Sequence, residues 1–265
     1  MRILLPPSEG KDVPSARTSR RLEIGSLSIP ALQAARTVLI EHLVALCRDE
    51  PDLARKALGL SVHQSEQVQM NADLMGLPAA PASRIFTGVL FQALDLPSLA
   101  GQDLRRANRR LLISSGLYGL VHPTDVIAPY RLPGDVSLPG IGPLTKFWRP
   151  PMAVALTDIV GKGMLLVDMR SSTYVQLGPL TGPLARNAVT VKIWQAGSGG
   201  QRTAVSHANK ESKGQIARLL ASAPERPTVP ADLVDLLRDH GWDAELALAT
   251  RPEVPHRLDV TVPTK

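Results

Sequence analysis

The chain contains one cysteine, Cys47, and six histidines among its 265 residues. A single cysteine excludes an intrachain disulfide and a cysteine-based zinc site. The histidines are scattered, with no His-x3-His pair and no HExxH motif. We therefore expect no metal site built by the protein alone, and no cofactor.

Long apolar runs are absent as well. The opening MRILLPPSEGK has too short an apolar segment for a signal peptide, and no stretch reaches the length of a membrane span. We expect a cytoplasmic protein that does not contact a membrane and acts as a monomer. The common phosphate-loop and hydrolase signatures, GxGxxG, GxxxxGK[ST] and GxSxG, are missing too.

Aromatic residues make up only 3% of the chain, so aliphatic side chains must form most of the core. This scarcity argues against a platform that stacks single-stranded bases. The net charge of +6 instead favours anionic partners such as nucleic acids, nucleotides or acidic surfaces.

Apolar periodicity and turn residues predict a mixed α/β (α+β) fold with a mixed sheet and surrounding helices. Helices are expected over 32–46, 62–75, 101–110, 145–160, 208–221 and 230–240. Strands are expected at 1–5, 85–90, 111–114, 164–169, 188–194 and 203–207, with a hairpin tip at 196–200. We predict one compact domain over 1–250 and a loose, proline-rich tail over 251–265.

Two predicted helices carry clustered basic residues. QDLRRANRRLL places Arg105, Arg106, Arg109 and Arg110 on an arc of about 140°, opposite the leucines. Such a face either meets an anion or is simply solvated.

The second cluster lies in ANKESKGQIARLL, where Lys210, Lys213, Gly214 and Arg218 share one face. A glycine inside a helix costs about 1 kcal/mol relative to alanine. Close approach of a phosphate, or close packing of another helix, would compensate for that cost.

The stretch LPGIGPLTKFW, residues 138–148, has the Gly-apolar-Gly turn of a DNA-binding hairpin, followed by Lys146. A helix-hairpin-helix needs a preceding helix, which Pro129, Pro133 and Gly134 forbid. We therefore predict a turn that leads into the helix near Thr145. An alternative hairpin combines helix 101–110 with the glycine turn at 116–119.

The central run SSGLYGLVHPTDVIAPYRL, residues 114–132, resembles the signature of the YaaA family of bacterial proteins. Further matches occur in the same order at ILLPPSEGK, FTG, KFW, SSTY and SHANKESKGQIARLL. The resemblance implies a compact, family-specific fold with a basic cleft and DNA binding through a helix-hairpin-helix-like element. It also implies a role in limiting free iron and oxidative DNA damage during peroxide exposure. The matched positions are Ser8, Lys11, Thr87, Gly88, Gly116, Tyr118, Gly119, Pro123, Asp125, Pro129, Tyr130, Arg131, Phe147, Trp148, Tyr174, Lys210, Gly214 and Arg218.

Two functions are compatible with these residues. The first is binding of duplex or branched DNA through phosphates, with little sequence preference. The predicted DNA- or anion-binding residues are Arg105, Arg106, Arg109, Arg110, Arg131, Lys146, Lys210, Lys213, Gly214 and Arg218.

The second function is catalysis on a small anionic substrate, in a pocket formed by Ser8, Lys11, Tyr118, Arg131 and Lys210. Ser8, Glu9 and Lys11 follow the first strand, and Arg131 could clamp a carboxylate or phosphate. Tyr118 or Tyr174 could donate a proton, with Asp125 or Asp168 as base. The candidate catalytic residues are Ser8, Lys11, Tyr118, Asp125 and Arg131. A structural role, in which Arg131 pairs with an internal carboxylate, is the third interpretation.

Overall fold

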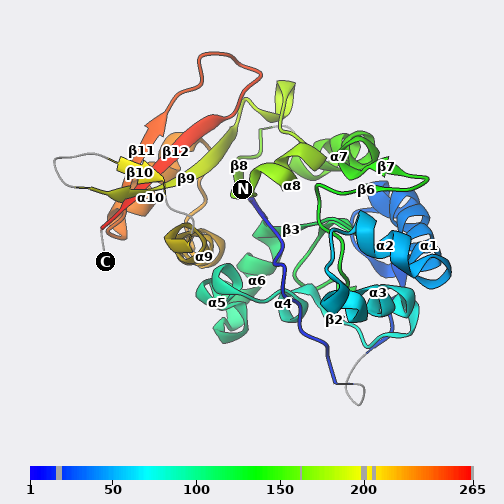
Figure 1. The fold of residues 1–265 in the computed structure, drawn as a ribbon. Coiled ribbons are helices and arrows are strands. Elements are labelled where there is room, and N and C mark those ends of the chain that lie inside the picture. Colours follow the sequence, from blue (N-terminus) through cyan, green and yellow to red (C-terminus); the bar gives the residue numbers. More distant parts are fainter. Residues whose placement is uncertain (16–19, 162, 198–201, 205–206, 264–265) are drawn as a thin grey trace.

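The computed structural model describes residues 1–15, 20–161, 163–197, 202–204 and 207–263. A mixed sheet runs through the centre of one compact domain (Figure 1). Its strands follow the order β11-β12-β9-β8-β1-β3-β4, and β10 pairs with β9 outside this path. The strands are β1 (Arg2–Leu5), β3 (Leu111–Ser115), β4 (Gly119–Val121), β8 (Leu166–Asp168), β9 (Ala188–Ala196), β10 (Arg202–Ala204), β11 (Asp243–Ala247) and β12 (His256–Val262).

The strands at the centre of the sheet, β12, β9, β8, β1 and β3, run parallel to one another. Ile3, Leu4 and Leu5 of β1 are completely buried, as expected for a parallel strand that is covered on both faces. The outer strands β11 and β4 are antiparallel to their neighbours. Because the central strands are parallel, β1, β3 and β8 all end at one edge of the sheet, called here the carboxyl edge.

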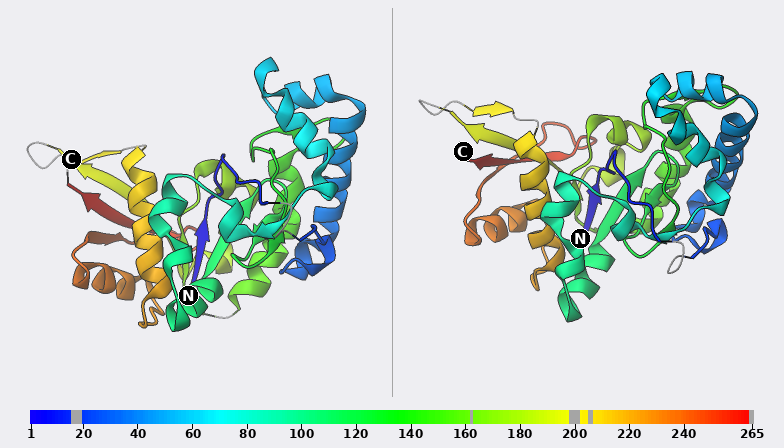
Figure 2. Two further views of the ribbon diagram at one scale, coloured as in Figure 1. Left: turned by 90° about the horizontal axis from the view of Figure 1, so that it is seen from below. Right: turned by 60° about the horizontal axis from the view of Figure 1, so that its bottom comes forward.

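Helices cover both faces of this sheet (Figures 1 and 2). α5, α6 and α9 pack side by side on one face, and α7 and α8 lie on the other. α1, α2 and α3 form a group beyond β4. The helices are α1 (Gln33–Asp49), α2 (Pro51–Ala57), α3 (Ser65–Ala72), α4 (Ala82–Ile85), α5 (Val89–Leu94), α6 (Gly101–Arg110), α7 (Leu144–Val160), α8 (Ser172–Leu177), α9 (His207–Ser222) and α10 (Pro230–Asp239). Two small strand pairs complete the fold, β2 (Ala80–Pro81) with β5 (Val126–Ile127) and β6 (Ser137–Leu138) with β7 (Gly142–Pro143).

The predicted mixed α/β class is confirmed, but two local predictions are wrong. Residues 85–90 form no strand: α4 ends at Ile85, and α5 begins at Val89 after Gly88, whose φ is 93°. Residues 256–262 are not a loose tail, because they form β12 between β11 and β9 with Leu258 and Val260 fully buried. In the hairpin expected at 196–200, residues 198–200 lie outside the described residues.

Candidate anion site at the carboxyl edge of the sheet

The loop that follows β1 is fixed at the carboxyl edge by its own hydrogen bonds (dark blue in Figure 2). The Ser8 hydroxyl accepts a bond from the Thr87 backbone N–H at 2.9 Å and donates to the Gly10 carbonyl at 2.5 Å. Lys11 pairs with Phe86 in an isolated antiparallel bridge. Ser8 therefore acts as a clamp between two chain segments, and its hydroxyl is already used.

Lys11 points back over this loop. Its ammonium donates to the Ser8 carbonyl at 3.0 Å and lies 4.4 Å from the centroid of the Tyr130 ring. Burial, and to a smaller extent the charge of Arg131, lower the pKa of Lys11 from 10.5 to about 8, while Glu9 acts in the opposite direction. Lys11 is thus a cation that can gain or lose a proton near neutral pH.

Arg131 lies beside Lys11 and is held through its backbone. The buried Asn71 side chain donates to the Arg131 carbonyl at 2.8 Å and accepts from its N–H at 2.9 Å. The guanidinium pairs with the carboxylate of Glu9, which is 74% exposed. The buried Nε has no acceptor among the described residues. An anionic ligand could therefore replace the exposed Glu9 carboxylate and use the remaining donor capacity of Arg131.

α9 brings Lys213 to the same edge, next to the end of β8. Its ammonium donates to the Met169 carbonyl at 3.2 Å, and burial lowers its pKa, which Asp168 partly offsets. Asp168 itself is fully engaged by Arg170, with bonds of 2.9 and 2.7 Å between buried side chains. Asp168 therefore holds Arg170 in place and does not offer a free base.

Lys210 lies three positions before Lys213, hence next to it on the surface of α9. Lys210 is exposed and has no partner among the described residues. We refer to Lys11, Arg131, Lys210 and Lys213 as the carboxyl-edge site.

Tyr118 and Asp125 do not line this site. The completely buried Tyr118 hydroxyl donates to the Ala128 carbonyl at 3.1 Å, and burial raises its pKa well above the ordinary value. Asp125 accepts bonds from the Ser28 hydroxyl at 2.6 Å and from the His122 N–H at 2.9 Å. Both residues stabilise the core of the central motif. The prediction that they are catalytic groups is therefore wrong for Tyr118 and Asp125. Tyr174 is nearer to Glu9 and Arg131, and burial raises its pKa to about 12.

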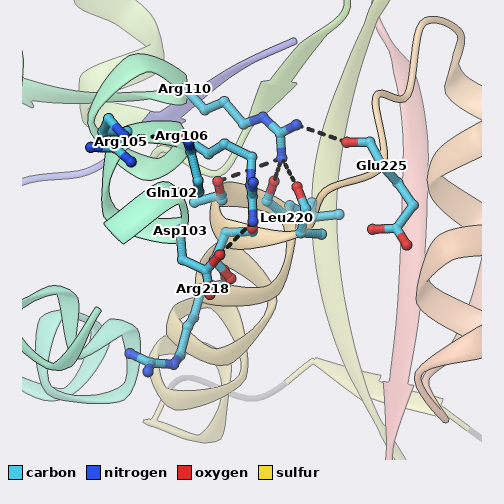
Figure 3. Close-up of polar contacts among 11 residues, drawn as sticks. Gln102, Asp103, Arg105, Arg106, Arg110, Arg218, Leu220 and Glu225 are labelled. Carbon is cyan, nitrogen blue, oxygen red and sulfur yellow. Dashed lines mark hydrogen bonds and ion pairs between the residues drawn. The ribbon is translucent and has the colours of Figure 1, made fainter. Parts of the chain in front are cut away.

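The four arginines of α6 do not act as one surface, and Figure 3 shows three of them, Arg105, Arg106 and Arg110. Arg110 donates to the carbonyls of Leu220, Ala223 and Glu225 at 2.7–2.8 Å, and Arg106 donates to that of Ser222 at 2.6 Å. These carbonyls lie in the last turn of α9 and just beyond it, where no backbone N–H is available. Arg106 and Arg110 therefore cap α9, whereas Arg105 and Arg109 remain exposed.

In the second cluster, two of the four predicted residues are also structural. A Cβ on Gly214 would lie 2.3 Å from the Leu90 carbonyl and 2.7 Å from Ala93 Cβ, so this glycine permits close packing of α9 on α5. Arg218 donates to the Leu94 and Asp95 carbonyls and to the Ser98 hydroxyl. The packing explanation for Gly214 is therefore confirmed, and Arg218 is already occupied.

The LPGIGP stretch forms the β6–β7 pair, with Gly140 and Gly142 at φ of 78° and 81°, and leads directly into α7. The residues between β5 and β6 are not helical. The alternative hairpin is wrong as well, because α6 continues into the buried strand β3 and residues 116–118 are buried. Neither segment makes a helix-hairpin-helix. Lys146 is exposed on the first turn of α7.

Asn71 and Arg170 were missed by sequence reasoning. Asn71 precedes Arg131 by 60 residues, and no local pattern links the two. Arg170 could have been suspected from the DMRSSTY stretch that follows the strand at 166–168. Among the described residues, no group of three His, Cys, Asp or Glu side chains could hold a metal ion, and no helix is long and apolar enough to cross a membrane.

Fold and site together define a mixed α/β protein that gathers basic side chains where parallel strands end, a favoured place for ligands in such sheets. The sequence matches the family described as peroxide stress protein YaaA over residues 1–245. A UPF0246 protein of Streptomyces coelicolor is 43% identical over 262 residues, which are 99% of this chain and 98% of that protein. Another, from Corynebacterium efficiens, is 37% identical over 247 residues, 93% and 95% of the two chains. The chain belongs to the YaaA family of peroxide stress proteins.

Proposed function

We propose that this peroxide stress protein binds duplex or branched DNA through backbone phosphates and thereby helps to limit iron-dependent oxidative damage. The observation that carries the proposal is the carboxyl-edge site, in which cations from three separate segments gather. Among the described residues, Lys210 contacts no acidic side chain, and the Arg131 guanidinium pairs only with the exposed Glu9. Phosphate contacts carry no base information, so we expect low sequence preference.

Duplex affinity should fall steeply as salt increases, because each phosphate contact releases counterions. Replacing Lys210 with alanine removes one such contact without disturbing the core, so the slope of log K against log salt should decrease by about 1. The measurement is fluorescence anisotropy of a labelled duplex between about 50 and 200 mM salt. Lys56→Ala, an exposed change of equal charge on α2, is the matched control. Equal slopes in both variants, or binding that ignores salt, would contradict DNA binding at this site.

A second candidate function is catalysis on a small anionic substrate, and Lys11 favours it specifically. A lysine with a pKa of about 8 can exchange a proton with a substrate near neutral pH. Arg131 next to it supplies a guanidinium suited to a carboxylate or phosphate. Of the five residues predicted for this pocket, Tyr118 is excluded because it is buried. The Ser8 hydroxyl is used in hydrogen bonds within its loop and to Thr87.

The protonation of Lys11 gives this candidate a pH test. Lys11 attracts an anion only while its ammonium is protonated. In the folded protein the pKa of Lys11 lies below the ordinary 10.5. Affinity for sulfate, whose charge is constant in this range, should therefore fall about tenfold between pH 7 and 9. Arg131 and Glu9 are the charged groups that act on Lys11. Calorimetry with Lys11→Met should give weaker binding with a smaller dependence on pH; a flat profile in the unmodified protein would rule out Lys11 as a ligand group.

A further inference from the structure

A second group of arginines lies at the opposite end of the same strands. Arg2 begins β1, Arg109 and Arg110 immediately precede β3, and Met164 precedes β8. Together with Arg106 and Arg226 these residues line a pocket of about 540 Å³. Pockets of this size are common for small ligands. We call it the amino-edge pocket.

The five arginines of this pocket are unequally engaged. Arg106 and Arg110 are compensated by the C-terminal carbonyls of α9 (Figure 3). The side chains of Arg2, Arg109 and Arg226 form no hydrogen bond or ion pair with any described residue. Three guanidiniums from three segments thus face one space with their hydrogen-bonding capacity unused.

No carboxylate compensates this charge from within the pocket, as far as the chain is described. The lining residues other than the arginines are Met1, Gln102, Met164, Pro224, Pro227 and Thr228. The acidic side chains near the pocket have other partners or point to solvent. Asp103 pairs with Arg106, and Asp232 accepts bonds from the Thr228 N–H and hydroxyl. Glu225 is exposed. Burial lowers the pKa of Arg2, and the nearby charge of Arg109 acts in the same direction.

Like charges held together without compensation destabilise a fold, so a bound anion would relieve the repulsion. Guanidiniums bind phosphate oxygens in bidentate fashion, and three of them carry more positive charge than the roughly two negative charges of one phosphate group. The apolar side chains of Met164, Pro224 and Pro227 line part of the wall. We propose that the amino-edge pocket binds a small molecule with two or more linked phosphate groups. This proposal is independent of DNA binding at the carboxyl edge.

The test uses inorganic tripolyphosphate as the probe, with orthophosphate for comparison, in calorimetric titrations of the full chain. Tripolyphosphate should bind more tightly than orthophosphate and raise the melting temperature. Arg109→Gln/Arg226→Gln should weaken it by at least about tenfold, because bonds to charged groups are among the strongest. Both side chains are exposed, so the variant should fold normally.

Arg105→Gln/Arg149→Gln is the matched control, since it removes the same charge from exposed positions outside the pocket. It should change the affinity by less than about threefold, as expected for screened surface charges. Lys210→Ala should likewise leave tripolyphosphate binding intact, which separates this pocket from the carboxyl-edge site. Equal losses in the two double variants would show a general charge effect and overturn the proposal. The proposal would also be overturned if tripolyphosphate failed to bind while duplex affinity depended on Arg109 and Arg226. In that case the pocket would bind nucleic acid.

Discussion

Replacing Arg110 with methionine is expected to lower the free energy of unfolding by about 3 kcal/mol. The guanidinium donates to the Leu220, Ala223 and Glu225 carbonyls, and the residue is only 9% exposed. Methionine has a similar length but no donor, so partly buried carbonyls at the end of α9 would lose their partners. Relief of repulsion from Arg106, Arg109 and Arg226 offsets a part of this loss.

Urea unfolding of Arg110→Met and Arg109→Met would measure the difference directly. Arg109 is the adjacent residue and carries the same charge, but it is exposed and its side chain makes no hydrogen bond with the described residues. Its replacement should change the unfolding free energy by no more than about 0.5 kcal/mol. Similar losses in the two variants would mean that Arg110 acts through charge alone and does not cap α9.

An alanine at Gly116 should destabilise the protein still more, by over about 4 kcal/mol. The added Cβ would lie 2.3 Å from the Leu132 carbonyl oxygen and 3.3 Å from its carbonyl carbon, and backbone atoms cannot move aside cheaply. The Gly116 carbonyl also accepts the bond from the buried Trp148 indole at 2.8 Å. The substitution would thus separate the turn after β3 from the segment that carries Tyr130 and Arg131.

The soluble yield and the urea midpoint of Gly116→Ala report this effect. Gly25→Ala is the control, because a Cβ there meets only the end of the flexible Gln33 side chain at 4.0 Å. That change should alter the stability by less than about 1 kcal/mol. If Gly116→Ala unfolded at the same urea concentration as the control, the close approach of residues 116 and 132 would not be required for the fold.

Both effects depend on contacts between segments far apart in the chain, and such contacts could not be predicted from the sequence. Periodicity identified α1 through its apolar stripe, and Pro230 and Gly241 marked the two ends of α10. The sequence also located α6, α7 and α9. It failed at residues 85–90, where a short apolar run is broken by Gly88 into two helical pieces. Short runs of this kind are ambiguous until their neighbours are known.

The two basic clusters likewise show what could be predicted for the candidate site from the sequence and what could not. Sequence placed four arginines on α6 and four residues on one face of α9, but it could not say which would find acceptors. Arg106, Arg110 and Arg218 reach backbone carbonyls more than 100 residues away, so they stabilise the fold. Lys210, Arg105 and Arg109 find no acidic partner among the described residues and stay available for an anion.

The sequence by itself determined the mixed α/β class, most helices, the family and the excess of positive charge. Those properties follow from local periodicity, composition and motif order, which are present in the linear chain. Only the tertiary structure decided that Lys11, Arg131 and Lys213 meet at one edge of the sheet and Arg2, Arg109 and Arg226 at the other. The reason is that parallel strands such as β1, β3 and β8 bring together residues separated by more than 100 positions, and no local preference encodes their order in the sheet.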